Sequence, residues 1–186
     1  MKKQALRPTL VLLCICTVVS GVLAVIHHFT SQALQKDPAE VVASMRSDYL
    51  AVLPTATDFE LLYPTDSGIP EEKGTAVQVV RSDVGYLITA LSNGQYDSSP
   101  IRVLVGIDLD GKVVGVRVLK SSETPGVGSR ANSDAFLSQF VGGTAFSADG
   151  KAGTKVDAVT GATKSSKAII VAVNAAMEAY AEWSAQ

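Results

Sequence analysis

The chain has 186 residues, of which 47% are hydrophobic and 18% are charged. This length suits one soluble domain with a short additional segment and leaves no room for two large domains. The net charge of −2 lacks the basic excess of nucleic-acid-binding proteins, so nucleic acid is not expected as a partner. The two cysteines, Cys14 and Cys16, both lie near the N-terminus, so the rest of the chain has no disulfide.

Residues 8–26 form an uncharged apolar run that follows Lys2, Lys3 and Arg7. As a helix rising about 1.5 Å per residue, this run roughly matches the ~30 Å hydrocarbon core of a bilayer. The basic flank predicts a cytoplasmic N-terminus and export of the remaining chain. We therefore expect residues 1–29 to form a transmembrane anchor.

A cleaved secretory signal peptide is the competing interpretation of the same residues, because it also begins basic and then turns apolar. The apolar run is longer than a usual signal-peptide core, and no clean small-x-small cleavage site follows it. Leu13 and Ile15 precede the cysteines, where a lipoprotein signal has a small residue. These features favour an uncleaved anchor, and both interpretations export the domain.

A leading helix and a connector are expected over residues 30–74. Asp37 as N-cap and Pro38 as first helical residue are typical of a helix start. Pro54 ends the pattern, so the helix is expected over residues 38–52. Its apolar positions repeat at helical spacing: Val42, Met45, Tyr49 and Val52.

The middle of the chain is rich in β-forming residues, and the domain is expected over residues 75–186. Four strands are predicted, at residues 75–81, 86–91, 101–108 and 112–119. Asp110-Gly111 lies between the last two, and this dipeptide favours a tight hairpin turn in which both residues take positive φ. The sheet is therefore predicted to be antiparallel.

Two further helices are expected after the strands. Ser133 is placed to cap a short helix ending at Phe140. A longer helix over residues 163–183 contains an entirely apolar stretch at 168–173, so it should be largely buried. Strands in the middle with helices at both ends predict an α+β fold with an antiparallel sheet and flanking helices.

The segment with most chemical interest lies at the start of that last helix, at residues 157–163. A helix start offers free N–H groups and the positive end of a dipole, which together favour a phosphate. Gly161 allows close backbone approach, and nearby lysines add positive charge. Judged on these residues alone, a plain capping role for Thr160 or Thr163 remains the more common alternative.

A second segment, residues 121–128, follows the last predicted strand. Pro125-Gly126 suits a type II turn, and Gly128 is another flexible position. Glu123 and Thr124 offer polar contacts. The ordinary interpretation is a loop at a strand end, and the functional one is a backbone that lies against a flat ring.

Together the two segments resemble the FMN-binding domain of the G subunit of the Rnf ion-translocating electron-transfer complex, which is related to the C subunit of the sodium-translocating NADH:quinone reductase. The family motif D-x-x-[ST]-G-A-[ST] is matched by Asp157, Thr160, Gly161, Ala162 and Thr163. The family loop E-T-P-G-[hydrophobic]-G is matched by Glu123, Thr124, Pro125, Gly126, Val127 and Gly128.

The resemblance implies that a flavin transferase, using FAD and magnesium, joins FMN through its phosphate to Thr163. It also implies a one-electron relay in a complex that moves Na⁺ or H⁺, with the other subunits of that complex as partners. The expected location is the inner membrane, crossed once, with the flavin domain periplasmic. The sequence shows no candidate general acid or base and no metal-ligand cluster, so catalysis by the isolated chain is not expected.

Two other functions stay open on the sequence. One is a non-redox binding module, in which an exported domain uses the same helix start to hold a ligand or partner noncovalently. The other is a flavoprotein of a different extracytoplasmic electron-transfer chain. Detection of covalent FMN on Thr163 separates the first of these from the relay.

Overall fold

The computed structural model describes residues 12–13, 15–24, 37–64, 74–93, 100–123 and 125–185. By its contacts the chain divides into two units, Met1–Glu40 and Val41–Gln186. In the first unit, residues 12–13 and 15–24 are helical and exposed. No helix within the described residues is both long and apolar enough to cross a bilayer. The predicted anchor lies partly outside those residues.

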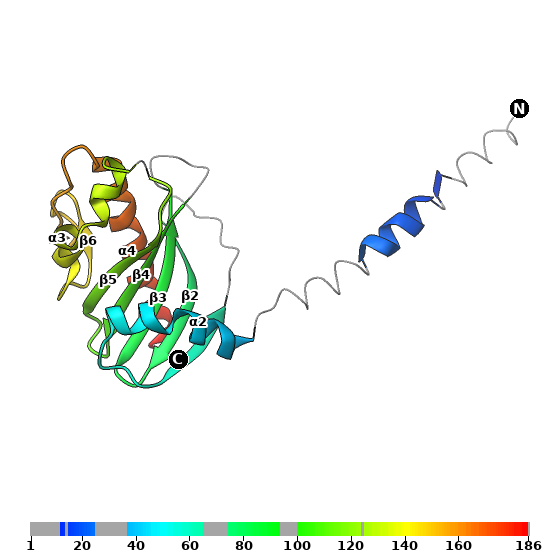
Figure 1. Cartoon of the computed structure of the whole chain (residues 1–186), viewed down its shortest axis with the longest axis horizontal. Coiled ribbons are helices and arrows are strands. Elements are labelled where there is room, and N and C mark those ends of the chain that lie inside the picture. The colour runs from blue at the N-terminus through cyan, green and yellow to red at the C-terminus, as the bar shows by residue number, and fades with distance from the viewer. Residues whose placement is uncertain are drawn as a thin grey trace, which may run out of the picture. The chain divides into compact units, whose positions relative to one another are not determined.

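The second unit is built on a five-stranded antiparallel sheet in which consecutive strands are neighbours (Figure 1). Its strands are β1 (Phe59–Pro64), β2 (Thr75–Ser82), β3 (Gly85–Ser92), β4 (Ile101–Asp108) and β5 (Val113–Lys120). The four predicted strands are confirmed to within one residue at each end. Strand β1 was not predicted, because its sequence FELLYP lacks apolar alternation and ends in proline, which an edge strand tolerates.

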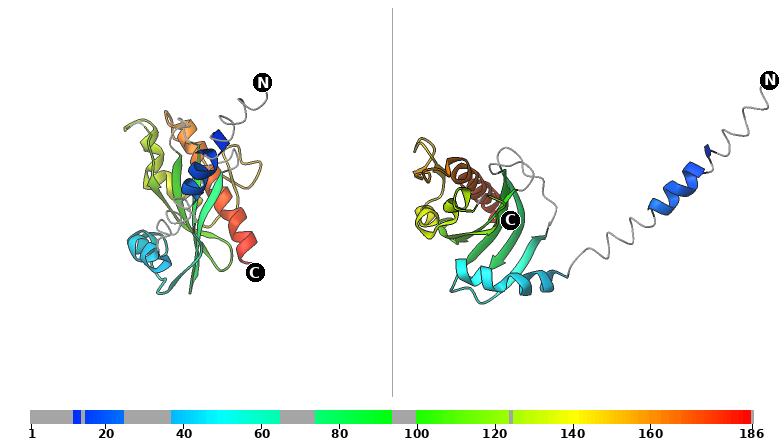
Figure 2. Two further views of the ribbon diagram at one scale, coloured as in Figure 1. Left: turned by 90° about the vertical axis from the view of Figure 1, so that its right-hand side faces the viewer. Right: turned by 45° about the horizontal axis from the view of Figure 1, so that its top comes forward.

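Two long helices cover opposite faces of the sheet, as the edge-on view in Figure 2 shows. Helices α2 (Pro38–Val52) and α4 (Thr163–Trp183) have the predicted bounds. The Asp37 carboxylate accepts the Ala39 N–H at 3.0 Å, which confirms the predicted cap. The α+β class is therefore confirmed for the described residues.

Strand β3 lies between both helices and is buried along its whole length. Ile88 and Ala90 pack in the cluster that contains α4, whereas Leu87 packs with Tyr49 and Val52 of α2. Burying both faces favours an apolar sequence, and the two polar residues of this central strand, Thr89 and Ser92, are buried with their hydroxyls hydrogen-bonded to Gln78 and to the Ala168 carbonyl.

The hairpin between β4 and β5 differs from the predicted two-residue turn. Gly111 has φ +79°, but no non-glycine residue in the described chain has positive φ, so the expectation for Asp110 was wrong. The loop holds three residues, 109–111, between Asp108 and Lys112. The Asp108 carboxylate accepts the N–H groups of Asp110 at 3.0 Å and Lys112 at 2.8 Å, which favours this longer loop.

Short elements fill the region between β5 and α4. They are η1 (Gly128–Asn132), α3 (Asp134–Leu137), η2 (Ser138–Phe140), β6 (Phe146–Ser147) and β7 (Thr154–Lys155). The predicted helix from Ser133 to Phe140 is thus α3 followed by a 3₁₀ turn. Ser133 is the N-cap residue, but its side chain makes no capping bond.

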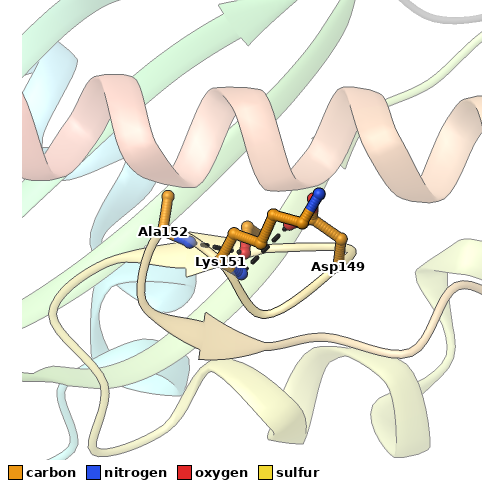
Figure 3. A network of polar contacts seen from close by, with 4 residues as sticks. Asp149, Lys151 and Ala152 are labelled. Atoms are coloured by element: carbon orange, nitrogen blue, oxygen red, sulfur yellow. Dashed lines mark hydrogen bonds and ion pairs between the residues drawn. The ribbon is translucent and has the colours of Figure 1, made fainter.

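Strand β6 is tied to α4 by one side chain. The Asn174 amide accepts the Phe146 N–H at 3.0 Å and donates to its carbonyl at 2.8 Å. The loop from β6 to β7 is held by Asp149, whose carboxylate accepts the Lys151 N–H at 3.1 Å (Figure 3). That bond lowers the pKa of Asp149. These contacts fix the segment that leads into residues 157–163.

Helix α2 sits on a glycine pair of the sheet. Gly106 of β4 lies opposite Gly115 of β5, and Val52 packs over both. A Cβ on Gly115 would lie 2.8 Å from the Val52 carbonyl oxygen, and one on Gly106 would lie 2.6 Å from Val52 Cγ1. The two glycines therefore set how closely α2 approaches the sheet.

We predict that Gly115→Ala lowers the free energy of unfolding by about 1–3 kcal/mol, because the new methyl group meets a backbone carbonyl and α2 must shift. The measurement is a urea titration followed by circular dichroism. Val114→Ala, at the adjacent, 37% exposed position, is the control and should change stability much less. An unchanged midpoint for Gly115→Ala would contradict the glycine-pair constraint.

Candidate functional site

Residues 157–163 form a turn that enters α4. The Ala162 N–H donates to the Val159 carbonyl at 2.9 Å, and Gly161 has φ +81°, as a type II turn requires at its third residue. Helix α4 begins at Thr163, with Ala162 as N-cap and no side-chain capping bond. The alternative that Thr160 or Thr163 caps the helix is therefore wrong. The N–H groups of the first turn have no side-chain cap and point out of the helix.

The turn is fixed at both ends by side chains. Gln139 of η2 accepts the Asp157 N–H at 2.8 Å and donates to its carbonyl at 3.2 Å. Ser166, buried in α4, accepts the Val159 N–H at 3.1 Å and donates to the Ala162 carbonyl at 2.9 Å. The backbone before Thr163 thus has one defined path.

The motif residues differ in exposure. Thr160, Gly161 and Thr163 are exposed, and Ala162 is buried. The hydroxyl of Thr163 is thus not enclosed in the core. Asp157 is also exposed, and its carboxylate pairs with Lys155 at 2.7 Å. The hydrogen bond and opposite charge of Asp157 raise the pKa of Lys155, so this lysine stays charged and its charge is paired with Asp157.

The 121–128 loop is joined to the same helix start by a buried hydrogen bond. Ser165, in the first turn of α4, donates from Oγ to Glu123 Oε2 at 2.5 Å. Gly128 closes against this pair, since a Cβ there would lie 2.7 Å from Glu123 Cβ and 2.9 Å from Ser165 Oγ. The structure therefore brings together the two segments that the sequence singled out.

The outer part of this loop faces solvent. Pro125, Gly126 and Val127 are exposed, and Gly126 has φ +77°, the value expected for the predicted type II turn. The Gly126 N–H donates to Ser129 Oγ at 2.9 Å. Thr124, the remaining predicted contact, lies outside the described residues.

A glycine in each of the two segments has open space beside it. A Cβ on Gly126 would meet nothing within 4 Å, and one on Gly161 would meet only Arg130 Nη1, at 3.7 Å. Val127 is 48% exposed and offers apolar surface. An exposed hydroxyl, an uncapped helix start and open glycines are together a donor set that fits FMN.

The sequence alone does not predict the roles of four residues at this site. Ser165 and Ser166 directly follow the motif, whereas Gln139 and Arg130 lie outside both singled-out segments. Two of them have partners far away in the chain: Ser165 and Glu123 are 42 residues apart, and Gln139 and Asp157 are 18 apart. The one available signal is a helix start with two consecutive serines on an otherwise buried face.

We predict that Ser165→Ala costs about 1–3 kcal/mol of unfolding free energy, because Glu123, only 8% exposed, loses a hydrogen-bond donor. Thermal and urea unfolding both measure this loss. Ser138→Ala is the matched control, since its exposed hydroxyl donates only to the nearby Ala135 carbonyl, at 3.2 Å. Equal losses in the two variants would show that the Glu123 contact contributes nothing beyond a surface serine.

Comparison with known proteins agrees with this site. An FMN-binding domain model matches residues 97–178, which include both segments. The chain is 31% identical to the G subunit of the Na⁺-translocating ferredoxin:NAD⁺ oxidoreductase complex of Acetobacterium woodii, over 96% of this chain and 92% of that protein. It is 29% identical to the G subunit of an ion-translocating oxidoreductase complex of Methanosarcina acetivorans, covering 95% and 94%.

A third relative is the G subunit of the proton-translocating ferredoxin:NAD⁺ oxidoreductase complex of Clostridium ljungdahlii, at 28% identity over 88% of this chain and 84% of that protein. All three alignments run over most of both chains. The chain therefore belongs to the family of G subunits of ion-translocating oxidoreductase complexes and contains that family's FMN-binding domain.

Proposed function

We propose that this chain is an electron-transfer subunit of an ion-translocating oxidoreductase complex and carries FMN bound covalently to Thr163. The observation that carries the proposal is the exposed Thr163 at the uncapped start of α4, which the hydrogen bond between Ser165 and Glu123 joins to the 121–128 loop. The FMN-binding domain match and the names of the relatives support the same function.

Attachment is a phosphoryl transfer from FAD. A bond forms between Thr163 Oγ1 and the phosphorus on the riboflavin side, and the pyrophosphate bond breaks. AMP leaves, and the hydroxyl proton passes to solvent. A flavin transferase that uses magnesium supplies the catalysis, so Thr163 is an acceptor and needs no base of its own.

The residues around Thr163 bind and orient the cofactor. The N–H groups of the first turn of α4 and the helix dipole favour the negative phosphate. The 125–127 turn, held through Glu123 and Ser165, provides apolar surface at Val127. When bound, FMN supplies one-electron redox chemistry, which the protein tunes by nearby charge and N–H groups.

The proposed membrane topology puts this site on the periplasmic side. Residues 1–29 are proposed as a single-pass anchor in the inner membrane with the N-terminus in the cytoplasm. Residues 30–74 then lead to an FMN-binding domain at 75–186 on the periplasmic side. Neighbouring subunits of the complex are the proposed electron donors and acceptors, with Na⁺ or H⁺ as the coupled ion.

We predict an adduct of FMN mass on the chain when it is produced with a flavin transferase. Peptide mapping should place the adduct on Thr163. Thr163→Ser should keep the adduct, because a hydroxyl remains, and Thr163→Ala should lose it. Thr154→Ala is the control, since this exposed threonine lies outside both the 121–128 and the 157–163 segments, and it should keep the adduct.

The competing functions give different outcomes. Bare wild-type protein from such a host favours a non-redox binding module and removes the covalent proposal. An adduct on a chain that does not associate with other redox subunits points to a flavoprotein of another extracytoplasmic electron-transfer chain. Co-purification from membranes of the native host distinguishes that case.

A further inference from the structure

Arg130 reaches the turn that precedes the proposed attachment residue. It lies in η1, which connects the 121–128 loop to α3 and packs against α4. Its Nη1 is 3.7 Å from the position that a Cβ would take on Gly161, and no other atom lies within 4 Å of that position. Gly161 is two residues from Thr163, so the guanidinium lies over the backbone that leads to the acceptor hydroxyl.

The positive charge of Arg130 is available. The residue is exposed, and among the carboxylates of the described residues none forms an ion pair with it. Lys155 is already paired with Asp157 at 2.7 Å, whereas the exposed Lys164 directly follows Thr163 and adds positive charge at the same turn. Arg130 therefore brings to this turn a positive charge that no carboxylate of the described residues pairs with.

We propose that Arg130 binds the phosphate that links FMN to Thr163; this inference rests on the proposed function. A phosphate joined to both riboflavin and Thr163 is a diester with one negative charge and two non-bridging oxygens. A guanidinium presents parallel N–H donors that match two such oxygens, whereas a lysine offers only a point charge. The helix start and Arg130 then contact the phosphate from two separate elements.

The open space at Gly161 has a second consequence for this contact. A side chain at position 161 would occupy the gap between the turn and Arg130 Nη1, and φ +81° disfavours any residue with a Cβ there. Glycine at position 161 thus allows the positive φ of the turn and leaves space for the guanidinium to reach the phosphate.

The test follows the full chain through loading with purified flavin transferase, FAD and Mg²⁺. Arg130→Gln should slow the initial rate of adduct formation roughly tenfold, the effect of losing one charge-assisted hydrogen bond. It should also move the ³¹P resonance of the loaded protein. Arg130→Lys should fall between wild type and Arg130→Gln in both measurements. It keeps the positive charge but loses the parallel N–H donors of the guanidinium.

Arg81→Gln is the matched control for loss of an exposed arginine. Arg81 pairs across the sheet with Tyr86, whose ring contacts Tyr180 near the opposite end of α4, with ring centroids 5.3 Å apart. This variant should match wild type in both rate and resonance. Thermal unfolding of each variant checks that the fold is kept.

The ³¹P resonance decides the outcome. If it coincides in wild type, Arg81→Gln and Arg130→Gln, the proposal is overturned even where loading is slower, since Arg130 then contacts the transferase and not the phosphate. If Arg130→Gln cannot be loaded, the comparison is made with Arg130→Lys. Absence of adduct on the wild-type chain is a different result, because it removes the proposed function itself.

Discussion

The buried hydrogen bond from Ser165 to Glu123 is the contact on which the site depends. It joins a loop that follows β5 to the first turn of α4, and Gly128 leaves the space in which the two side chains meet. A buried carboxylate without a hydrogen bond costs free energy, so separating the loop from the helix is unfavourable. The bond therefore holds the 121–128 loop against the first turn of the helix that begins at Thr163.

The sheet supplies the rigid support for that contact. Both of its faces are covered, by α4 on one side and α2 on the other, and the close approach of α2 requires two paired glycines. Close-packed interiors of this kind resist small displacements. The start of α4 is therefore held by the core while its first-turn N–H groups remain at the surface, an arrangement that suits a cofactor attached at one point.

Much of this fold was predictable, and the failures have physical reasons. Helix α4 and strand β4 were predicted with their observed bounds because apolar periodicity and turn residues agree there. The β4–β5 turn was wrong because Asp-Gly suits both two- and three-residue loops, and the side chain of Asp108 decides between them. At the site, the motifs were visible by resemblance, but the contact between Ser165 and Glu123 depends on tertiary packing that no spacing reveals.

If FMN is attached to Thr163 as proposed, the hydrogen bonds between Gln139 and Asp157 affect how the flavin transferase recognises this chain. Gln139 hydrogen-bonds the start of this segment and Ser166 hydrogen-bonds its end. The backbone of residues 157–162 is therefore preorganised in the folded domain. A short synthetic peptide of the same residues lacks these hydrogen bonds and loses backbone freedom when it adopts that shape, at about 1–2 kcal/mol per residue. Under the proposed attachment, the folded domain and not the bare motif is then expected to be the efficient acceptor.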